Sequence, residues 1–111
     1  MTESIDRAVI EGLSGAVGED FLGELIDTFF EEAPGMFEEM KQALAANDAD
    51  GFRRAAHSLK TNANTFGATE LAEQAKELEY MARENNLDIG ERLDHLENAY
   101  QQAADELESL K

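Results

Sequence analysis

Apolar residues recur along most of the chain at intervals of three and four positions, which is the spacing of the buried face of a helix. The pattern predicts six helices, at about residues 4–13, 19–33, 35–46, 50–66, 69–84 and 88–110. Ser14-Gly15 and Gly18 end the first helix. Pro34 ends or kinks the second, because proline has no N–H to donate. Gly67 follows the fourth helix, at the position where a left-handed residue commonly ends a helix.

The loops between these predicted helices are short, so consecutive helices are expected to pack antiparallel. The four helices from residue 35 onward predict an antiparallel up-down four-helix bundle of the all-α class, with one or two N-terminal helices covering one end. A single proline and a chain that is 42% hydrophobic agree with a helical fold with its own core. We expect one domain that spans residues 1–111.

The charge of the chain is strongly acidic, with 25 Asp and Glu against 9 Lys and Arg and a net charge of -16. This charge argues against nucleic acid and against anionic membrane surfaces as partners. No apolar run approaches the roughly 18 residues of a membrane span, and the first residues lack the features of a signal peptide. The absence of cysteine suits a reducing compartment. We therefore expect a cytoplasmic protein.

One segment departs from the acidic composition, because residues 51–69 contain no Asp or Glu. It holds three cations, Arg53, Arg54 and Lys60, together with His57. On a helical wheel of 100° per residue, its apolar residues share one arc of about 100°: Phe52, Ala55, Ala56, Leu59, Ala63 and Phe66. His57 lies about 150° from the centre of that arc. We therefore expect its imidazole to face solvent.

Arg53, Lys60, Thr61 and Asn64 are expected on the same side of this helix as His57, and all four are expected to be exposed. Lys60 lies three residues after the histidine and Arg53 four residues before it. An arriving phosphoryl group brings about two negative charges, which such cations compensate and nearby carboxylates would oppose. The lack of acids fits a site for an anion.

The next helix is placed by the register of an antiparallel hairpin whose turn is centred on residues 67–68. His57 is then level with Glu79, which lies at the flank of that helix's apolar stripe. We expect Glu79 to accept a hydrogen bond from one imidazole nitrogen, which fixes the tautomer and leaves the other nitrogen free as a nucleophile. Arg83, one turn further, adds positive potential. Charge and periodicity alone leave an interface patch without chemistry equally open.

The motifs in this region resemble those of the histidine-containing phosphotransfer (HPt) domain of bacterial multistep phosphorelays. The matching residues are His57-Ser58-Leu59-Lys60, Gly67-Ala68, Leu71 and Leu78-Glu79, and the helical segment broken at Pro34 fits the same family. The family usually has glycine directly after the lysine, where this chain has Thr61. A small residue there lets a partner approach the histidine, and threonine is still small.

The resemblance implies a role for each matching residue. His57 would be phosphorylated on Nε2, Lys60 would stabilise the phosphoryl group, and Glu79 would orient the imidazole through Nδ1. Arg53, Arg54, Thr61, Asn64 and Arg83 would contribute to partner docking, and Gly67 and Pro34 would be structural.

The partner implied by the resemblance is a response-regulator receiver domain, a hybrid sensor kinase or both. The phosphoryl group would pass to and from a receiver aspartate, with any Mg²⁺ held by the receiver and no cofactor on this chain. We expect the protein to be a monomer.

The residues of the chain also bear on three other functions. A kinase is disfavoured, because the chain has no glycine-rich nucleotide loop. A di-iron bundle requires two Glu-x-x-His motifs, and Arg54 and Arg92 stand where the glutamates would be. A helical adaptor that binds a signalling partner without phosphotransfer stays open. His95, which has Asp94 beside it, is interpreted as an ordinary surface residue.

Overall fold

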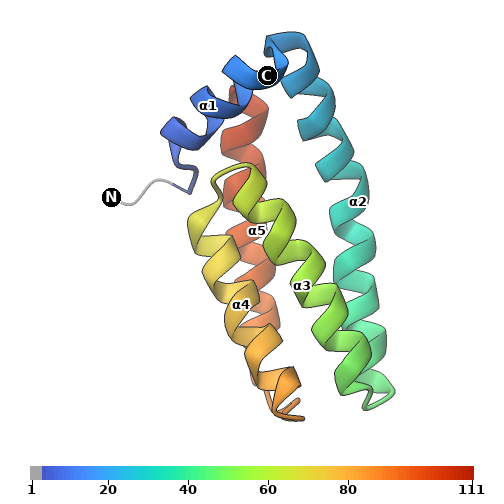
Figure 1. The fold of residues 1–111 in the computed structure, drawn as a ribbon. Coiled ribbons are helices and arrows are strands. Elements are labelled where there is room, and N and C mark those ends of the chain that lie inside the picture. The colour runs from blue at the N-terminus through green and yellow to red at the C-terminus, as the bar shows by residue number, and fades with distance from the viewer. Residues whose placement is uncertain (1–3) are drawn as a thin grey trace.

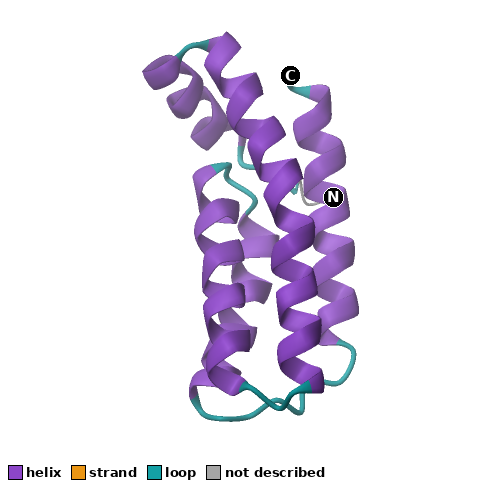
Figure 2. Cartoon of the chain, turned by 90° about the vertical axis from the view of Figure 1, so that its right-hand side faces the viewer, coloured by secondary structure: helices purple, strands orange, loops and turns teal. Residues whose placement is uncertain are grey.

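The computed structural model describes residues 4–111, and all regular secondary structure in that part of the chain is helical (Figures 1 and 2). The helices are α1 (Arg7–Val17), α2 (Glu19–Ala45), α3 (Ala49–Thr65), α4 (Thr69–Arg83) and α5 (Arg92–Ser109). The predicted all-α class is confirmed. Within the same residues, none of the helices combines the length and apolar character that a bilayer crossing requires.

Helices α2 to α5 form the antiparallel four-helix bundle that the sequence predicts. Helices α3 and α5 each pack against α2 and α4, so they occupy diagonally opposite corners. Figure 1 shows α1 lying across one end of this bundle, where it packs on α2. Figure 2 shows α1 and the start of α2 extending beyond the turn that joins α3 to α4. One N-terminal helix, and not two, covers the end.

The core is one continuous cluster of apolar side chains, most of them from the four long helices, and Ile5, Ile10 of α1 and Ile89 belong to it as well. Phe29 of α2 stacks on Phe66 with ring centroids 5.2 Å apart, and meets Tyr100 of α5 edge-on at 5.6 Å. Phe52 and Leu59 of α3 are completely buried. Full burial of each such side chain stabilises the fold by about 1.5–3 kcal/mol.

The predicted helix boundary at Pro34 is wrong, because α2 runs through the proline without a break. The buried face of α2 continues on both sides of it, with Phe29 and Ala33 before the proline and Phe37 and Met40 after it. Pro34 itself is exposed, and it removes only one helical hydrogen bond, because proline has no N–H to donate. Packing of this continuous stripe outweighs the local preference for a break.

The first helix also differs from its predicted bounds of residues 4–13. It begins at Arg7, because Asp6 caps it by accepting a hydrogen bond from the Ala8 N–H. It then continues through the exposed Gly15 to Val17. Gly18, with φ of 88°, ends it. A serine–glycine pair lowers helix propensity without requiring a break.

Gly67 ends the α3 region as predicted, with φ of 70°. The N-terminal segment crosses this turn, and the Asp6 N–H donates to the Gly67 carbonyl over 2.7 Å. A Cβ at position 67 would lie 2.8 Å from the Asp6 carbonyl oxygen and 2.9 Å from the Val9 Cβ. The position therefore requires glycine both for its left-handed backbone and for the close approach of the N-terminal segment.

We expect Gly67→Ala to lower the free energy of unfolding by about 1–2 kcal/mol from the left-handed backbone alone, and by more because of the contacts with Asp6 and Val9. Gly35→Ala is the matched control, because Gly35 lies inside α2 with no atom near its Cβ position. That change should stabilise the fold by about 0.5–1 kcal/mol. Urea denaturation measures the free energy of unfolding of both variants. An equal change in Gly67→Ala and Gly35→Ala would contradict this role of Gly67.

Candidate functional site

The exposed face of α3 presents His57 to solvent, as the wheel predicts. All six residues of the predicted core arc are buried, whereas the side chain of His57 is 55% exposed. The segment is helical because Asp48 caps its start by accepting from the Gly51 N–H at 3.0 Å, and because one apolar face is buried along its whole length. The histidine is thus held on a rigid helix, with its ring turned away from the core.

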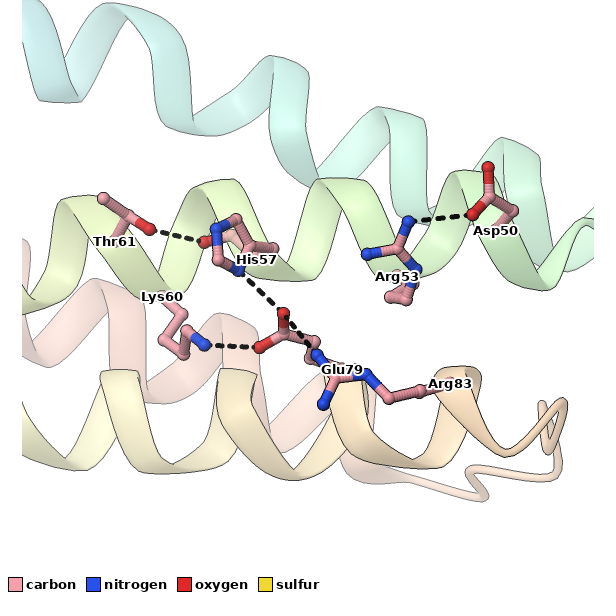
Figure 3. A network of polar contacts seen from close by, with 7 residues as sticks. All are labelled: Asp50, Arg53, His57, Lys60, Thr61, Glu79 and Arg83. Atoms are coloured by element: carbon pink, nitrogen blue, oxygen red, sulfur yellow. Dashed lines mark hydrogen bonds and ion pairs between the residues drawn. The ribbon is translucent and has the colours of Figure 1, made fainter.

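The register of the α3–α4 hairpin brings Glu79 to the histidine. Figure 3 shows the Glu79 carboxylate from α4 pointing to the imidazole of His57 on α3. The distance between His57 Nδ1 and Glu79 Oε2 is 2.7 Å. The predicted contact is therefore present, and it joins two residues that lie 22 positions apart in the sequence.

Glu79 also contacts two cationic side chains. Lys60 Nζ donates to Glu79 Oε1 over 2.6 Å, and Arg83 Nη2 lies 3.5 Å from Oε2 (Figure 3). The residue is only 3% exposed. Burial disfavours its charged form most strongly, but hydrogen bonds from Lys60 and His57 and the charges of these groups together outweigh it. The pKa of Glu79 therefore lies below its ordinary value of 4.5, and the carboxylate is ionised at neutral pH.

Two burial predictions for this site are corrected by the structure. Lys60 was expected to be exposed, but its side chain is 24% exposed, because its stem extends toward α4 to reach Glu79. Arg53 was also expected to be exposed, but its side chain is only 34% exposed. Glu79, for which the sequence predicts a contact and no degree of burial, is the one buried charged residue among residues 4–111. The wheel gives the angle of a side chain about its helix, whereas the neighbouring helix and its long side chains decide its burial.

The ionised carboxylate determines which imidazole nitrogen is available. Ionised Glu79 can only accept hydrogen bonds, so in the neutral ring the hydrogen resides on Nδ1 of His57. Nε2 then carries the lone pair. Because the ring is more than half exposed, this arrangement presents a nucleophilic nitrogen to a partner in solvent.

The remaining residues of this face are short, or are folded back onto α3. Thr61 is exposed, and its Oγ1 donates to the carbonyl of His57 over 3.1 Å. Asn62 donates in the same way to Ser58 at 2.9 Å. Asn64 is exposed, as predicted. These positions therefore place no long side chain beside the imidazole, despite the threonine in place of glycine.

Arg53 and Arg54 share one acid that the sequence analysis did not single out. Arg53 Nη2 donates to Asp50 over 2.9 Å (Figure 3), and Arg54 Nε lies 3.4 Å from the same carboxylate. The hydrogen bond from Arg53, with the charges of both arginines, lowers the pKa of the Asp50 carboxyl. Spacings of three and four residues on one helix are the signal that could have identified this cluster.

His95 lies apart from these residues, on α5, and is exposed as predicted. It lines a shallow cleft of about 480 Å³ beside the ion pair between Arg92 Nε and Glu77 Oε1, whose atoms are 3.0 Å apart. Nothing in the described residues brings a lysine or a buried carboxylate to its ring. Within residues 4–111, no group of three or more His, Asp or Glu side chains is arranged to hold a metal ion.

Comparisons with known proteins agree with this geometry. The family model described as Hpt domain matches residues 24–107, which include His57 and Glu79. The phosphorelay protein LuxU of Vibrio harveyi is 28% identical over 86 residues, which cover 78% of this chain and 75% of that protein. The crystal structure of histidine-containing phosphotransfer protein B from Pseudomonas aeruginosa PAO1 matches with a TM-score of 0.87 and 25% identity, over 98% of this chain and 95% of that one.

Removal of the buried charge tests the electrostatic description of this site. Glu79→Gln should lower the free energy of unfolding at pH 7 by about 1.5–3 kcal/mol, the usual contribution of hydrogen bonds to a charged group. Because the pKa of Glu79 is lowered by folding, its contribution is present above about pH 4.5 and is lost as the pH falls through the folded value. Urea denaturation at pH 7 and pH 3 should show that the difference in free energy of unfolding between Glu79→Gln and wild type is smaller at pH 3.

Glu73→Gln is the matched control, because Glu73 lies on the same helix and is exposed. It should change stability by less than about 0.5 kcal/mol at either pH. If the free energy of unfolding of Glu79→Gln differed from wild type by the same amount at pH 7 and pH 3, the ionised Glu79 carboxylate would not be stabilising.

Proposed function

Because the chain belongs to the Hpt domain family, we propose that His57 is the residue that carries the phosphoryl group. The protein performs histidine phosphotransfer in two-component signalling. The observation that supports His57 is its hydrogen bond to the buried Glu79 at 2.7 Å, made by a ring that is more than half exposed. His95 has no such partner among the described residues.

The transfer step follows from the hydrogen on Nδ1. The lone pair of His57 Nε2 attacks the phosphorus of an aspartyl phosphate on the partner, and the bond from phosphorus to the aspartate oxygen breaks. The aspartate leaves with the electron pair as a carboxylate. The imidazole retains its Nδ1 proton and becomes a cation, which the Glu79 carboxylate stabilises. No proton has to move, and the reverse step uses the same groups.

Lys60 is the residue best placed to follow the phosphoryl group. Its Nζ is held on Glu79 Oε1, one helical turn from His57, and its flexible stem lets the ammonium group reach an anion on Nε2. Arg83 lies at the other oxygen, Oε2. These cations compensate the charge that phosphorylation adds.

The partner class is a receiver domain or a sensor kinase of a phosphorelay, as the family implies. We propose that the partner's aspartate site holds any Mg²⁺ that the step requires, and that this chain has no ATP-dependent kinase activity of its own. A monomeric state and a cytoplasmic location stay predictions. The alternative is an adaptor that binds the partner without phosphotransfer. Phosphoryl label on this chain supports transfer, and binding without label supports the adaptor.

We expect His57→Gln to abolish phosphorylation, because glutamine has no nucleophilic nitrogen. The variant is incubated with a phosphorylated receiver domain, and acid-labile label on the chain is measured. His95→Gln is the matched control, because the same substitution at an exposed histidine of α5 should leave transfer within about twofold of wild type. Acid-labile label that persists on His57→Gln would show that another residue accepts the group.

Thr61 tests where the partner docks. Thr61→Trp places a large side chain one turn from the imidazole on the exposed face, so we expect transfer to fall by about tenfold or more while the helix stays intact. Thr61→Gly should retain transfer but lower the free energy of unfolding by about 0.5–1 kcal/mol. Rates of label transfer and thermal midpoints separate the two effects. Wild-type transfer by Thr61→Trp would exclude docking over this face.

A further inference from the structure

The charged hydrogen-bond donors beside His57 are all held by one carboxylate. Nδ1 of the ring, Lys60 and Arg83 contact the two oxygens of Glu79. A phosphoryl group on Nε2 presents three further oxygens that accept hydrogen bonds. Lys60 and Arg83 can donate to these oxygens only by leaving Glu79 or by sharing their hydrogens with it. A donor that no carboxylate holds is therefore of particular interest at this site.

Thr61 carries such a donor. Its Oγ1 donates to the carbonyl of His57 over 3.1 Å, and the residue is exposed (Figure 3). Both residues lie inside α3, so the same carbonyl is also the helical partner of the Thr61 N–H, four residues ahead. The hydroxyl bond is thus a second bond to this carbonyl. The helix keeps its own hydrogen bond when the hydroxyl turns elsewhere.

The hydroxyl lies near the nitrogen that would carry the phosphoryl group. Side chains of a helix lean toward its N-terminus, so Thr61 leans over the turn that carries His57. Nδ1 of the ring is turned to Glu79. Figure 3 shows the other nitrogen, Nε2, on the side of the ring that faces Thr61. Threonine in a helix divides between two side-chain rotamers, so rotation about one bond redirects its hydroxyl.

We propose that the Thr61 hydroxyl is a ligand of the phosphoryl group. When Nε2 of His57 is phosphorylated, the hydroxyl leaves the His57 carbonyl and donates to a phosphoryl oxygen. The inference rests on the proposed phosphotransfer at His57. The proton stays on the hydroxyl, and no covalent bond changes. A hydrogen bond to a charged acceptor is about twice as strong as one between neutral groups, so the exchange is favourable. The residue at the family's usual glycine position thus stabilises the phosphorylated form.

The phosphoryl group itself reports this hydrogen bond. A donor stabilises the dianion more than the monoanion, so it lowers the phosphoryl pKa, which is ordinarily about 6. Thr61→Val keeps the branched shape of the side chain and removes the hydroxyl. Each chain is labelled by a phosphorylated receiver domain that labels the wild type, and the ³¹P NMR signal is followed from about pH 5 to about pH 8. We expect the phosphoryl pKa of Thr61→Val to be higher by about half a pH unit, a factor of about three.

The same hydrogen bond shifts the distribution of label at equilibrium. With a receiver domain at about pH 8, where the dianion prevails, the ratio of label on the chain to label on the receiver should be about threefold lower for Thr61→Val than for wild type. Label still reaches the variant, because the attacking lone pair is on Nε2 of His57.

Thr65→Val is the matched control. Thr65 is exposed on the same helix, and its Oγ1 donates to the Thr61 carbonyl over 3.1 Å, which is the same kind of bond. It lies about two turns from His57, so its loss should leave the phosphoryl pKa and the label ratio as in wild type. Thr61→Ser retains the hydroxyl and should give both wild-type values. Thr61→Ala removes the hydroxyl without a β-branched side chain and should repeat the result of Thr61→Val.

Three results would overturn the inference while leaving phosphotransfer intact. They are a wild-type phosphoryl pKa in Thr61→Val, an equal change in Thr65→Val, and a failure of Thr61→Ser to restore the wild-type values. Absence of label on the wild-type chain with every receiver would instead contradict phosphotransfer itself. Thermal midpoints establish that folded proteins are compared. A purely structural role of Thr61 would change the midpoint and leave the phosphoryl pKa unchanged.

Discussion

The buried carboxylate of Glu79 is the interaction on which the rest of the site depends. An ionised carboxylate that is 3% exposed would cost several kcal/mol if it had no partner. Lys60 and His57 of α3 and Arg83 of α4 supply the compensating hydrogen bonds and charge. The side chains that orient the imidazole therefore also satisfy the charge buried between α3 and α4, the two helices that contact each other most extensively. The same contacts therefore set the geometry of the candidate site and the packing of these two helices.

That arrangement requires a fixed register between the two helices, and the register is set at a distance from the histidine. Gly67 lies in the turn that sets the register between His57 and Glu79. Its left-handed backbone defines the conformation of this turn. The N-terminal segment binds this turn, through the hydrogen bond from the Asp6 N–H to Gly67. The segment around α1 thus contacts the turn that joins the two helices of the site, although it contributes no side chain to the site.

Periodicity predicted the face of α3 that carries His57, and hairpin register predicted its contact with Glu79, because both follow from angle and rise along a regular helix. The same reasoning failed at Pro34, where a buried stripe that continues across the proline outweighs a local breaking signal. It also failed for the exposure of Lys60 and Arg53, which are both partly buried. Burial depends on where long side chains extend between helices, and a pattern of residue types along one helix does not contain that information.

The balance of charge around Glu79 suits a group that must be both accepted and released. With a neutral imidazole, Glu79, Lys60 and Arg83 together leave one excess positive charge. In the proposed transfer, a phosphoryl group on His57 Nε2 would add about two negative charges, while the imidazole would gain one positive charge. The phosphorylated site is then close to neutral. Neither the unphosphorylated nor the phosphorylated site has a large uncompensated charge, so the charges of the site do not strongly favour one form. The direction of the proposed transfer then depends on the partner that docks.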